Sequence, residues 1–395
     1  MISFEEATRE VSSRCKPLGA ESVPLTAAHQ RVLASPIRAM RDQPASDVSM
    51  MDGYALRATD AAAPLRVVGE VAAGSAPFAR ALEAGEAVRI FTGAPVPAGA
   101  DAVVMQERCV RGGDSIRVEE AVKAGQHIRQ RGEELTAGST VLPAGTVFDA
   151  AQVALAAACG VASVDVFRRP RVAILTTGNE LVPVGTEPPP GKLVETNSLS
   201  LAALCTDAGA LPLRLGLAGD DVALIADKLR SADADVLVTT GGASVGDHDH
   251  TEEALRALGG ELVFHRVAIR PGKPVLFGTT AKGQLVFGLP GNPAAATLGF
   301  ELFARLAIRM LQGDPRPQRT RLRAELSAPL KQVPGLTYFP RGRLSTALVF
   351  EPYGQQSSMQ IGSWANANAV AVLPPGDERL KPGAEIDVLL TGTLR

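Results

Sequence analysis

Strands, glycine-containing turns and helices alternate between residues 171 and 313. Three apolar runs, "RVAIL", "DVLV" and "QLVFGL", each lead into a polar or glycine-rich turn, and the last continues into "NPAAATLGFELFARLAIRML" with helical apolar spacing. Strands that are apolar throughout and alternate with helices are typical of a parallel sheet covered on both faces. Ligands bind such sheets at the carboxyl ends of the strands. The pattern therefore predicts an α/β domain whose binding site lies in the loops after these strands.

Two other stretches have the pattern of small β-domains. Between about 45 and 145, short apolar runs such as "LRVVGEV" and "DAVVMQE" are separated by glycine and proline, and similar runs such as "STALVFE" and "EIDVLLT" follow the proline-rich 313–319. Residues 149–167 predict a helix followed by a strand. Ser3 and Glu6 fit a capping box that opens an amphipathic N-terminal helix.

Composition and charge narrow the possible functions. A chain of 395 residues is too long for one core and predicts roughly two to four domains. With 40 basic and 42 acidic residues, the net charge of −2 gives no general attraction to nucleic acid or to an anionic membrane. The N-terminus lacks a signal-peptide pattern and no apolar run reaches about 18 residues, which predicts a soluble cytoplasmic protein. The cysteines have no zinc-site spacing and are interpreted as buried reduced thiols: Cys15, Cys109, Cys159 and Cys205.

The loops after the predicted strands carry the candidate chemistry. "TTGGASVG" and "GLPGNP" could hold a phosphate through backbone N–H groups, or could be glycine and proline turns required only by sterics. "TTGNEL" ends in Glu180, a carboxylate that favours a cation over an anion. "IRPGKPV" supplies Arg270 and Lys273, which suit phosphate but could also form an ordinary basic turn.

The segment "GDHDHT" at 246–251 leaves two metal hypotheses open. Histidine and carboxylate together bind transition metals, but the chain has only five histidines and no further motif that would complete a zinc site. A hard cation such as Mg²⁺, held by Asp247 or Asp249 with water and substrate phosphates, is the alternative.

Seven motifs, taken in order, resemble those of the MoeA-type molybdopterin molybdenumtransferases, which are similar to the E domain of gephyrin. They are "SMMDGYA", "FTGAPVPAGADAVVMQE", "GQHIRQRGEEL", "TTGNEL", "TTGGASVGDHDHT", "AIRPGKPVLFG" and "GLPGNPAAAT", with "PRG" and "GQQSSM" as looser matches near the C-terminus. The resemblance covers essentially the whole chain. It implies that molybdate is inserted into adenylylated molybdopterin with release of AMP, assisted by Mg²⁺, to form molybdenum cofactor.

The same resemblance implies an elongated, multidomain α/β plus β fold that forms a homodimer, with each active site shared between subunits. The central α/β molybdopterin-binding domain has a mostly parallel sheet. The resemblance implies four domains in the chain. They are 1–20 with 168–316 (molybdopterin-binding), 21–44 with 131–167 (a linking α/β domain), 45–130 (an inserted small β-domain carrying "MDGYA") and 317–395 (a C-terminal β-barrel-like domain). Molybdopterin adenylyltransferase and other cofactor-assembly proteins are possible partners.

Roles for individual residues also follow from the resemblance. Asp52 and Thr92 are expected to face the active site from the partner subunit, and Glu134 is expected to keep a catalytic carboxylate. The acidic groups around Mg²⁺ and the departing adenylate are Glu180, Asp220 and Asp249. The pterin and phosphate pocket is expected to contain Ser244, Arg266, Arg270, Lys273, Pro290 and Pro293, and molybdate is expected at Arg341 and Ser358.

Several positions depart from the family pattern. Glu134 stands where an aspartate is usual, so its carboxylate is one methylene further from the backbone. Asn179 replaces an aspartate and removes one possible metal ligand. Arg266 and Arg270 occupy positions where lysine is common, and each exchanges a point charge for a planar fork.

Three other functions are consistent with parts of the sequence. A molybdopterin adenylyltransferase would share the fold of 171–313 but lack "MDGYA" and the C-terminal β-domain. A non-catalytic scaffold could keep an inherited cofactor pocket, although Asp52, Thr92, Glu180 and Asp249 are all retained. A general sugar-phosphate or nucleotide-binding α/β protein would need only the glycine loops.

Overall fold

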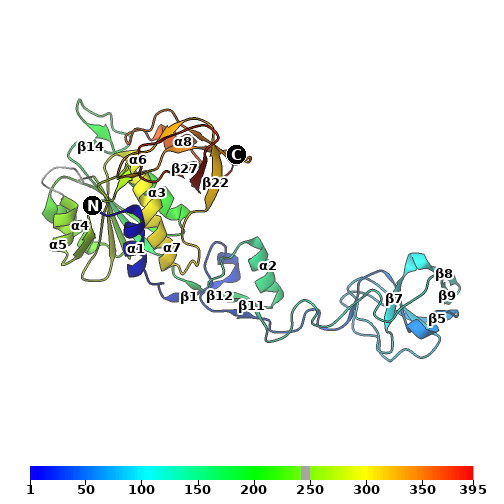
Figure 1. Cartoon of the computed structure of the whole chain (residues 1–395). Coiled ribbons are helices and arrows are strands. Elements are labelled where there is room, and N and C mark those ends of the chain that lie inside the picture. Colours follow the sequence, from blue (N-terminus) through cyan, green and yellow to red (C-terminus); the bar gives the residue numbers. More distant parts are fainter. Residues whose placement is uncertain (242–249, 395) are drawn as a thin grey trace. The chain divides into compact units, whose positions relative to one another are not determined.

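The chain folds into two compact units, each of which is described by itself. The computed structural model describes residues 1–241 and 250–394. Unit 1 contains residues 1–21, 30–34 and 165–395, and unit 2 contains 22–29 and 35–164. Figure 1 shows the elements of both units. The four narrower domain ranges expected from the sequence stay a prediction.

Unit 1 is built on a six-stranded sheet whose order is β16-β13-β17-β21-β20-β18. The first four strands in this order run parallel, and β20 and β18 join antiparallel at one edge. The predicted α/β domain with a mostly parallel sheet is therefore confirmed. The strands are β13 (Arg171–Thr177), β16 (Leu211–Ala218), β17 (Val236–Thr240), β18 (Glu261–Phe264), β20 (Leu276–Thr279) and β21 (Leu285–Leu289).

Helices cover both faces of this sheet, as the continuous apolar strands require (Figure 1). Along β13, Val172 and Ile174 belong to the core shared with α1, α3 and α6 to α7, whereas Ala173 and Leu175 belong to the core shared with α4 and α5. Successive strand residues point to opposite faces, so each face buries every second residue. The helices are α1 (Phe4–Arg14), α3 (Asn197–Asp207), α4 (Val222–Ser231), α5 (His250–Ala257), α6 (Pro293–Gly299) and α7 (Arg305–Leu311).

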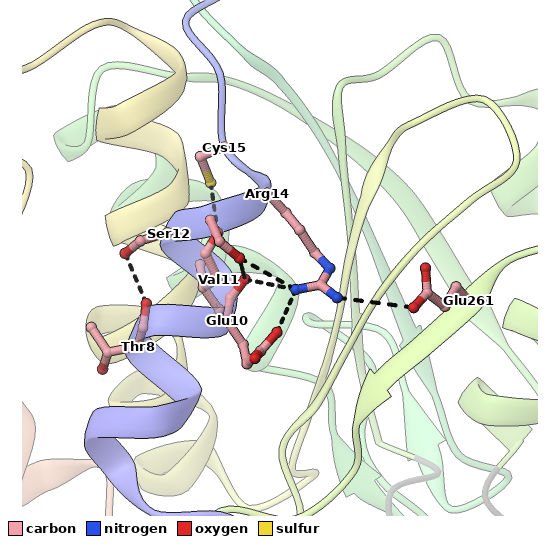
Figure 2. A network of polar contacts seen from close by, with 8 residues as sticks. Thr8, Glu10, Val11, Ser12, Arg14, Cys15 and Glu261 are labelled. Carbon is pink, nitrogen blue, oxygen red and sulfur yellow. Dashed lines mark hydrogen bonds and ion pairs between the residues drawn. The ribbon is translucent and has the colours of Figure 1, made fainter.

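The N-terminal helix begins where the sequence predicts. The Ser3 side chain accepts a hydrogen bond from the Glu6 backbone N–H at 3.1 Å, which satisfies one of the free donors at the start of α1. At its other end, Arg14 pairs with Glu10 and reaches toward Glu261 at the start of β18 (Figure 2), with 3.9 Å between Nη2 and Oε1. Because the side chains of Arg14, Glu10 and Glu261 are partly exposed, these ion pairs contribute little to the free energy of unfolding.

The long helix predicted after "GLPGNP" contains one π-helical turn, η4 (Phe300–Ala304), between α6 and α7. Phe303 in this turn is fully buried and packs edge-to-face against Phe4 and Phe264, with ring centroids 6.0 and 6.2 Å apart. The turn thus anchors α1 and the antiparallel edge of the sheet to one aromatic side chain.

The C-terminal part of unit 1 is a closed barrel with strand order β22-β26-β25-β27-β29, which confirms the predicted barrel-like domain. Its strands are β22 (Arg321–Leu326), β25 (Arg341–Leu344), β26 (Val349–Pro352), β27 (Ala369–Val372) and β29 (Glu385–Leu390). Shorter elements of unit 1 are β14 (Leu181–Val182), β15 (Leu193–Val194), β19 (Ile269–Arg270), β23 (Leu330–Lys331), β24 (Thr337–Tyr338), β28 (Arg379–Leu380) and α8 (Gly362–Asn366).

Unit 2 contains the small β-domain predicted between 45 and 145, a six-stranded sheet with the order β7-β4-β6-β5-β9-β8. Its strands are β4 (Gly53–Leu56), β5 (Leu65–Val71), β6 (Glu86–Ile90), β7 (Ala102–Met105), β8 (Cys109–Gly112) and β9 (Ser115–Val118). The predicted helix is α2 (Ala150–Ala158). The strand that follows it in the chain is β12 (Ser163–Phe167), which pairs with β1 (Ala20–Pro24), and both strands include residues of unit 1. The remaining elements are β2 (Ile37–Arg38), β3 (Val48–Ser49), β10 (Ile128–Arg129), β11 (Thr140–Leu142), η1 (Leu25–Ala27), η2 (Ala58–Asp60) and η3 (Gln106–Arg108).

The sequence predicts buried, reduced cysteines and no membrane-spanning segment. All four cysteines are free thiols, but only Cys159 and Cys205 are fully buried, because Cys15 and Cys109 lie at the edges of their cores. Within 1–241 and 250–394, no helix combines the length and apolar character needed to cross a bilayer.

We expect Phe303→Ala to destabilise unit 1 by about 3–5 kcal/mol, because it leaves a cavity between α1 and the sheet. Phe303→Leu fills most of that space and should cost clearly less. Urea unfolding followed by circular dichroism measures both changes. Equal losses for the two variants would contradict the packing described for the π-helical turn.

Candidate functional site

Unit 1 contains a cavity of about 990 Å³ at the carboxyl ends of β13, β17 and β21. This is the place that the strand and loop pattern predicts. The predicted site residues that line it are Glu180, Arg270, Lys273, Pro290, Pro293 and Ser358. The structure therefore gathers six predicted residues from four separate segments of the chain.

The turn after β13 supplies one acidic group of the cavity, Glu180. Gly178 has a φ of 143°, and a Cβ at that position would lie 2.7 Å from Oε2 of Glu180. Glycine thus lets the Glu180 carboxylate fold back over the turn. Asp220 does not line the cavity, but its backbone N–H and carboxylate exchange hydrogen bonds of 3.4 Å with Asn179, next to Glu180.

Arg270, one of the two basic residues that line the cavity, is held by the segment around β24. β19 pairs with β24, and the Phe339 backbone N–H donates to the Arg270 carbonyl at 2.8 Å. The Arg270 guanidinium lies 5.3 Å from the centroid of the Tyr338 ring, a cation–π contact. Arg270 and Lys273 both remain exposed, so their charges are available to a ligand. Arg266 is exposed too, but it does not line the cavity.

The loop before α6 brings the C-terminal segment to the cavity. The Asn292 side chain donates to the Ser358 hydroxyl at 3.0 Å, and the Ala294 backbone N–H donates to the Ser358 carbonyl at 3.0 Å. These two bonds fix Ser358 beside Pro290 and Pro293, from which it is separated by more than 60 residues in the sequence.

Arg341 lies behind the Ser358 loop and is only 1 % exposed. Its Nη2 donates to the Ser357 carbonyl at 2.9 Å, whereas Nε and Nη1 have no hydrogen-bond partner among the described residues. Burial lowers the pKa of this guanidinium from its ordinary value. A buried arginine with two unsatisfied nitrogens is unfavourable unless an acceptor reaches them, but Arg341 itself is not among the residues that line the cavity.

A group of buried polar residues on the cavity wall was not predicted from the sequence. Asn197 and Ser198 open α3, Glu195 precedes it, and Thr177 ends β13. Asn197, Glu195 and Thr177 line the cavity, and Asn197 Oδ1 and Thr177 Oγ1 are buried without a hydrogen-bond partner in the described part of the chain. The only sequence signal was a polar "ETNS" immediately before an apolar helical pattern.

Unit 2 carries the other predicted carboxylates. Asp52 accepts hydrogen bonds from both the backbone N–H and the hydroxyl of Thr92, each at 2.8 Å. These two bonds, with a contribution from the charge of Arg89, hold the pKa of Asp52 below its usual value. Glu134 is exposed and forms an ion pair with Arg129 at 2.8 Å.

Two predicted residues, Ser244 and Asp249, lie outside the described residues, as does His248. Among the residues that are described, no group of three or more histidine, cysteine, aspartate or glutamate side chains is arranged to hold a metal ion. Two carboxylates line the described part of the cavity, Glu180 and Glu195, and Glu195 already accepts hydrogen bonds from Ser198 and Thr176. Mg²⁺ is commonly held by one or two carboxylates together with substrate phosphates and water, so this donor set fits Mg²⁺.

The fold and the cavity together define a multidomain protein that joins an α/β binding domain to a closed barrel and carries a separate small β-domain. Three family models match the chain in this order: the MoeA N-terminal region (domain I and II) at 2–160, a probable molybdopterin binding domain at 173–310, and the MoeA C-terminal region (domain IV) at 323–391.

Known proteins match over nearly the whole chain. A molybdopterin molybdenumtransferase of Nostoc sp. (strain PCC 7120) is 37% identical over 93% of this chain and 88% of its own length. Molybdopterin molybdenumtransferase 2 of Mycobacterium tuberculosis (strain H37Rv) is 38% identical over 98% and 99%. The crystal structure of the molybdopterin biosynthesis MoeA protein from Pyrococcus horikoshii superposes with a TM-score of 0.86 at 31% identity, and covers 100% of both chains. The chain belongs to the MoeA family.

We expect Thr92→Val to raise the pKa of Asp52, because it removes one of the two donors to that carboxylate. The backbone donor remains, so the pKa should still lie below the ordinary value. The carboxyl carbon of Asp52, followed by NMR as the pH is lowered, reports this directly. Thr92→Ser keeps the hydroxyl and serves as the control; an unchanged Asp52 titration in Thr92→Val would contradict the described geometry.

Proposed function

We propose that this protein inserts molybdenum into adenylylated molybdopterin, using molybdate and Mg²⁺ and releasing AMP, to form molybdenum cofactor. Membership of the MoeA family and the names of its relatives support this activity. The observation that carries the proposal is the composition of the cavity: Glu180, Arg270 and Lys273 meet where the parallel strands end. Two cations, with the Glu180 carboxylate to hold a metal ion, suit a phosphoanhydride better than they suit a neutral ligand.

We propose that Arg270 and Lys273 bind the phosphate groups of the substrate. Arg270 offers a planar fork and Lys273 a compact charge, and both suit phosphate oxygens. Their fixed positions orient the phosphoanhydride, so that water adds to phosphorus, the bridging P–O bond breaks and AMP leaves.

Glu180 and Asp249 would hold Mg²⁺, and Asp220, the third acidic residue of the expected set, would act through the turn that carries Glu180. When bound, Mg²⁺ spreads the negative charge on the phosphate oxygens. Asp220 hydrogen-bonds to Asn179 rather than lining the cavity, so in this scheme it supports the Glu180 turn from behind.

Arg341 and Ser358 are the proposed molybdate ligands. Molybdate is a tetrahedral dianion, and the two unpartnered nitrogens of Arg341 supply donors that no described residue uses. The Ser358 hydroxyl and nearby backbone N–H groups provide further donors to the same oxyanion.

A second copy of the chain is proposed to complete the active site. Asp52 and Thr92 lie in unit 2, and their hydrogen bonds to each other hold the Asp52 carboxylate ionised. We propose that the partner subunit supplies this pair in a homodimer. The proposed location is the cytoplasm, with molybdopterin adenylyltransferase and other cofactor-assembly proteins as proposed partners. The match to both the N-terminal and C-terminal MoeA models argues against an adenylyltransferase.

The wild-type protein should release AMP from adenylylated molybdopterin when molybdate and Mg²⁺ are present, and the product should activate a cofactor-free molybdoenzyme. Glu180→Gln should slow AMP release by about a hundredfold or more, as expected when a preorganised charged group is removed from an active site. Glu187→Gln is the control, because Glu187 is exposed in the next loop, between β14 and β15, and does not line the cavity. If the wild type releases no AMP with any divalent metal, the proposed reaction is wrong.

Arg341→Met should weaken molybdate binding by about 10- to 100-fold, the usual worth of a hydrogen bond to a charged group. Isothermal titration calorimetry with molybdate alone measures this without any turnover. Arg343→Met is the control, since Arg343 lies on the same strand but is exposed. Equal molybdate affinities for wild type and Arg341→Met would rule out the oxyanion role.

A further inference from the structure

The hydrogen bonds around Asn197 determine which end of its side-chain amide is free. Nδ2 donates to the Gly291 carbonyl and to the Thr240 hydroxyl, both at 2.8 Å. The Thr240 hydroxyl in turn donates to the Pro290 carbonyl at 3.0 Å, so it can only accept from Asn197. The amide cannot be turned over without placing an oxygen against the Gly291 carbonyl. Oδ1 is therefore the atom that stays free.

This unpartnered oxygen belongs to a residue of the cavity wall. Asn197 is 6 % exposed, its Oδ1 has no partner among the described residues, and the residue lines the cavity. An unsatisfied buried acceptor costs free energy in the ligand-free protein. A bound N–H donor would recover that cost, so Asn197 Oδ1 is preorganised to receive one.

The surroundings of Asn197 add a second acceptor. Glu195 is 5 % exposed and lines the same cavity. Its carboxylate accepts from the Ser198 backbone N–H at 2.6 Å, from the Ser198 hydroxyl at 2.7 Å and from the Thr176 hydroxyl at 3.2 Å. Three bonds leave one of about four acceptor positions of a carboxylate unused. This wall of the cavity therefore offers the Glu195 carboxylate as a second acceptor in addition to Asn197.

Apolar side chains from the neighbouring strand pair also line the cavity. Leu181 of β14 and Leu193 and Val194 of β15 contribute to it, and Leu193 is 57 % exposed. Exposed apolar surface beside hydrogen-bond acceptors is the composition expected for a flat heteroaromatic ring that has N–H groups along one edge.

We propose that Asn197, with Glu195 beside it, determines specificity for the pterin ring of the substrate by accepting hydrogen bonds from its pyrimidinone edge. That edge carries two adjacent donors, the ring N3–H and the 2-amino group. Adenine, the other ring of the proposed substrate, presents an amino group flanked by ring nitrogens that are acceptors. Two neighbouring acceptors therefore match the two adjacent donors of the pterin better than they match the single amino group of adenine. This inference rests on the proposed function, because it assigns one part of that substrate to one wall of the cavity.

The test compares two ligands that differ at a single group of this edge. In 6-hydroxymethyllumazine an oxygen acceptor replaces the 2-amino donor of 6-hydroxymethylpterin. We expect the wild-type protein to bind the pterin about tenfold more tightly than the lumazine, as measured by quenching of their fluorescence. In Asn197→Leu, the ratio of the two affinities should fall close to one, whether the affinity for either pteridine rises or falls.

A structural role for Asn197 would give a different result. Thr240→Val breaks the same hydrogen-bond network but leaves Oδ1 of Asn197 in place, so it should keep the preference even if the protein becomes less stable. Equal binding of the two pteridines by the wild type, binding of neither, or equal loss of preference in both variants would overturn the proposal. AMP release by the wild type is measured separately, so failure of the pterin assignment is distinguishable from failure of the proposed reaction.

Discussion

The parallel pairing of β13 with β17 and of β17 with β21 is the constraint on which the rest of the structure depends. It buries both faces of these strands and brings the ends of all three to one edge of the sheet. Because polar groups are excluded from the strand interiors, the residues that can bind a charged ligand are confined to the loops at that edge. The chemistry of the cavity follows from this restriction.

The sheet could be predicted from the sequence because its signal is local. An apolar run such as "RVAIL" followed by "TTGNE" shows both where a strand lies and where it ends, without knowledge of its neighbours. The two β-domains were recognisable for a similar reason, since each short run is bounded by glycine or proline, whereas closure of the C-terminal one into a barrel was implied only by the family resemblance. The π-helical turn at 300–304 was not, because it leaves no break in the helical apolar pattern.

Some residues of the candidate site could be predicted from the sequence, and others could not. Glu180, Arg270 and Lys273 stand out because charged residues next to apolar strands are conspicuous, and the structure brings them to one cavity. Asn197 was missed because its importance comes from contacts with Thr240 and Gly291, which are 43 and 94 residues away in the chain. No local pattern distinguishes a buried asparagine with a free oxygen from one that caps a helix.

Buried polar groups in unit 1 fall into two classes when their partners are compared. Arg309 pairs with Asp314, and Glu301 is held by Arg319 through two hydrogen bonds of 2.8 and 2.9 Å. Such charges are satisfied within the protein, and their role is to hold segments together. Arg341 is buried at least as deeply, yet two of its nitrogens have no partner in the described residues. A folded chain tolerates such an unpaired group where ligand binding recovers the free energy, and Arg341 lies directly behind a loop that lines the cavity.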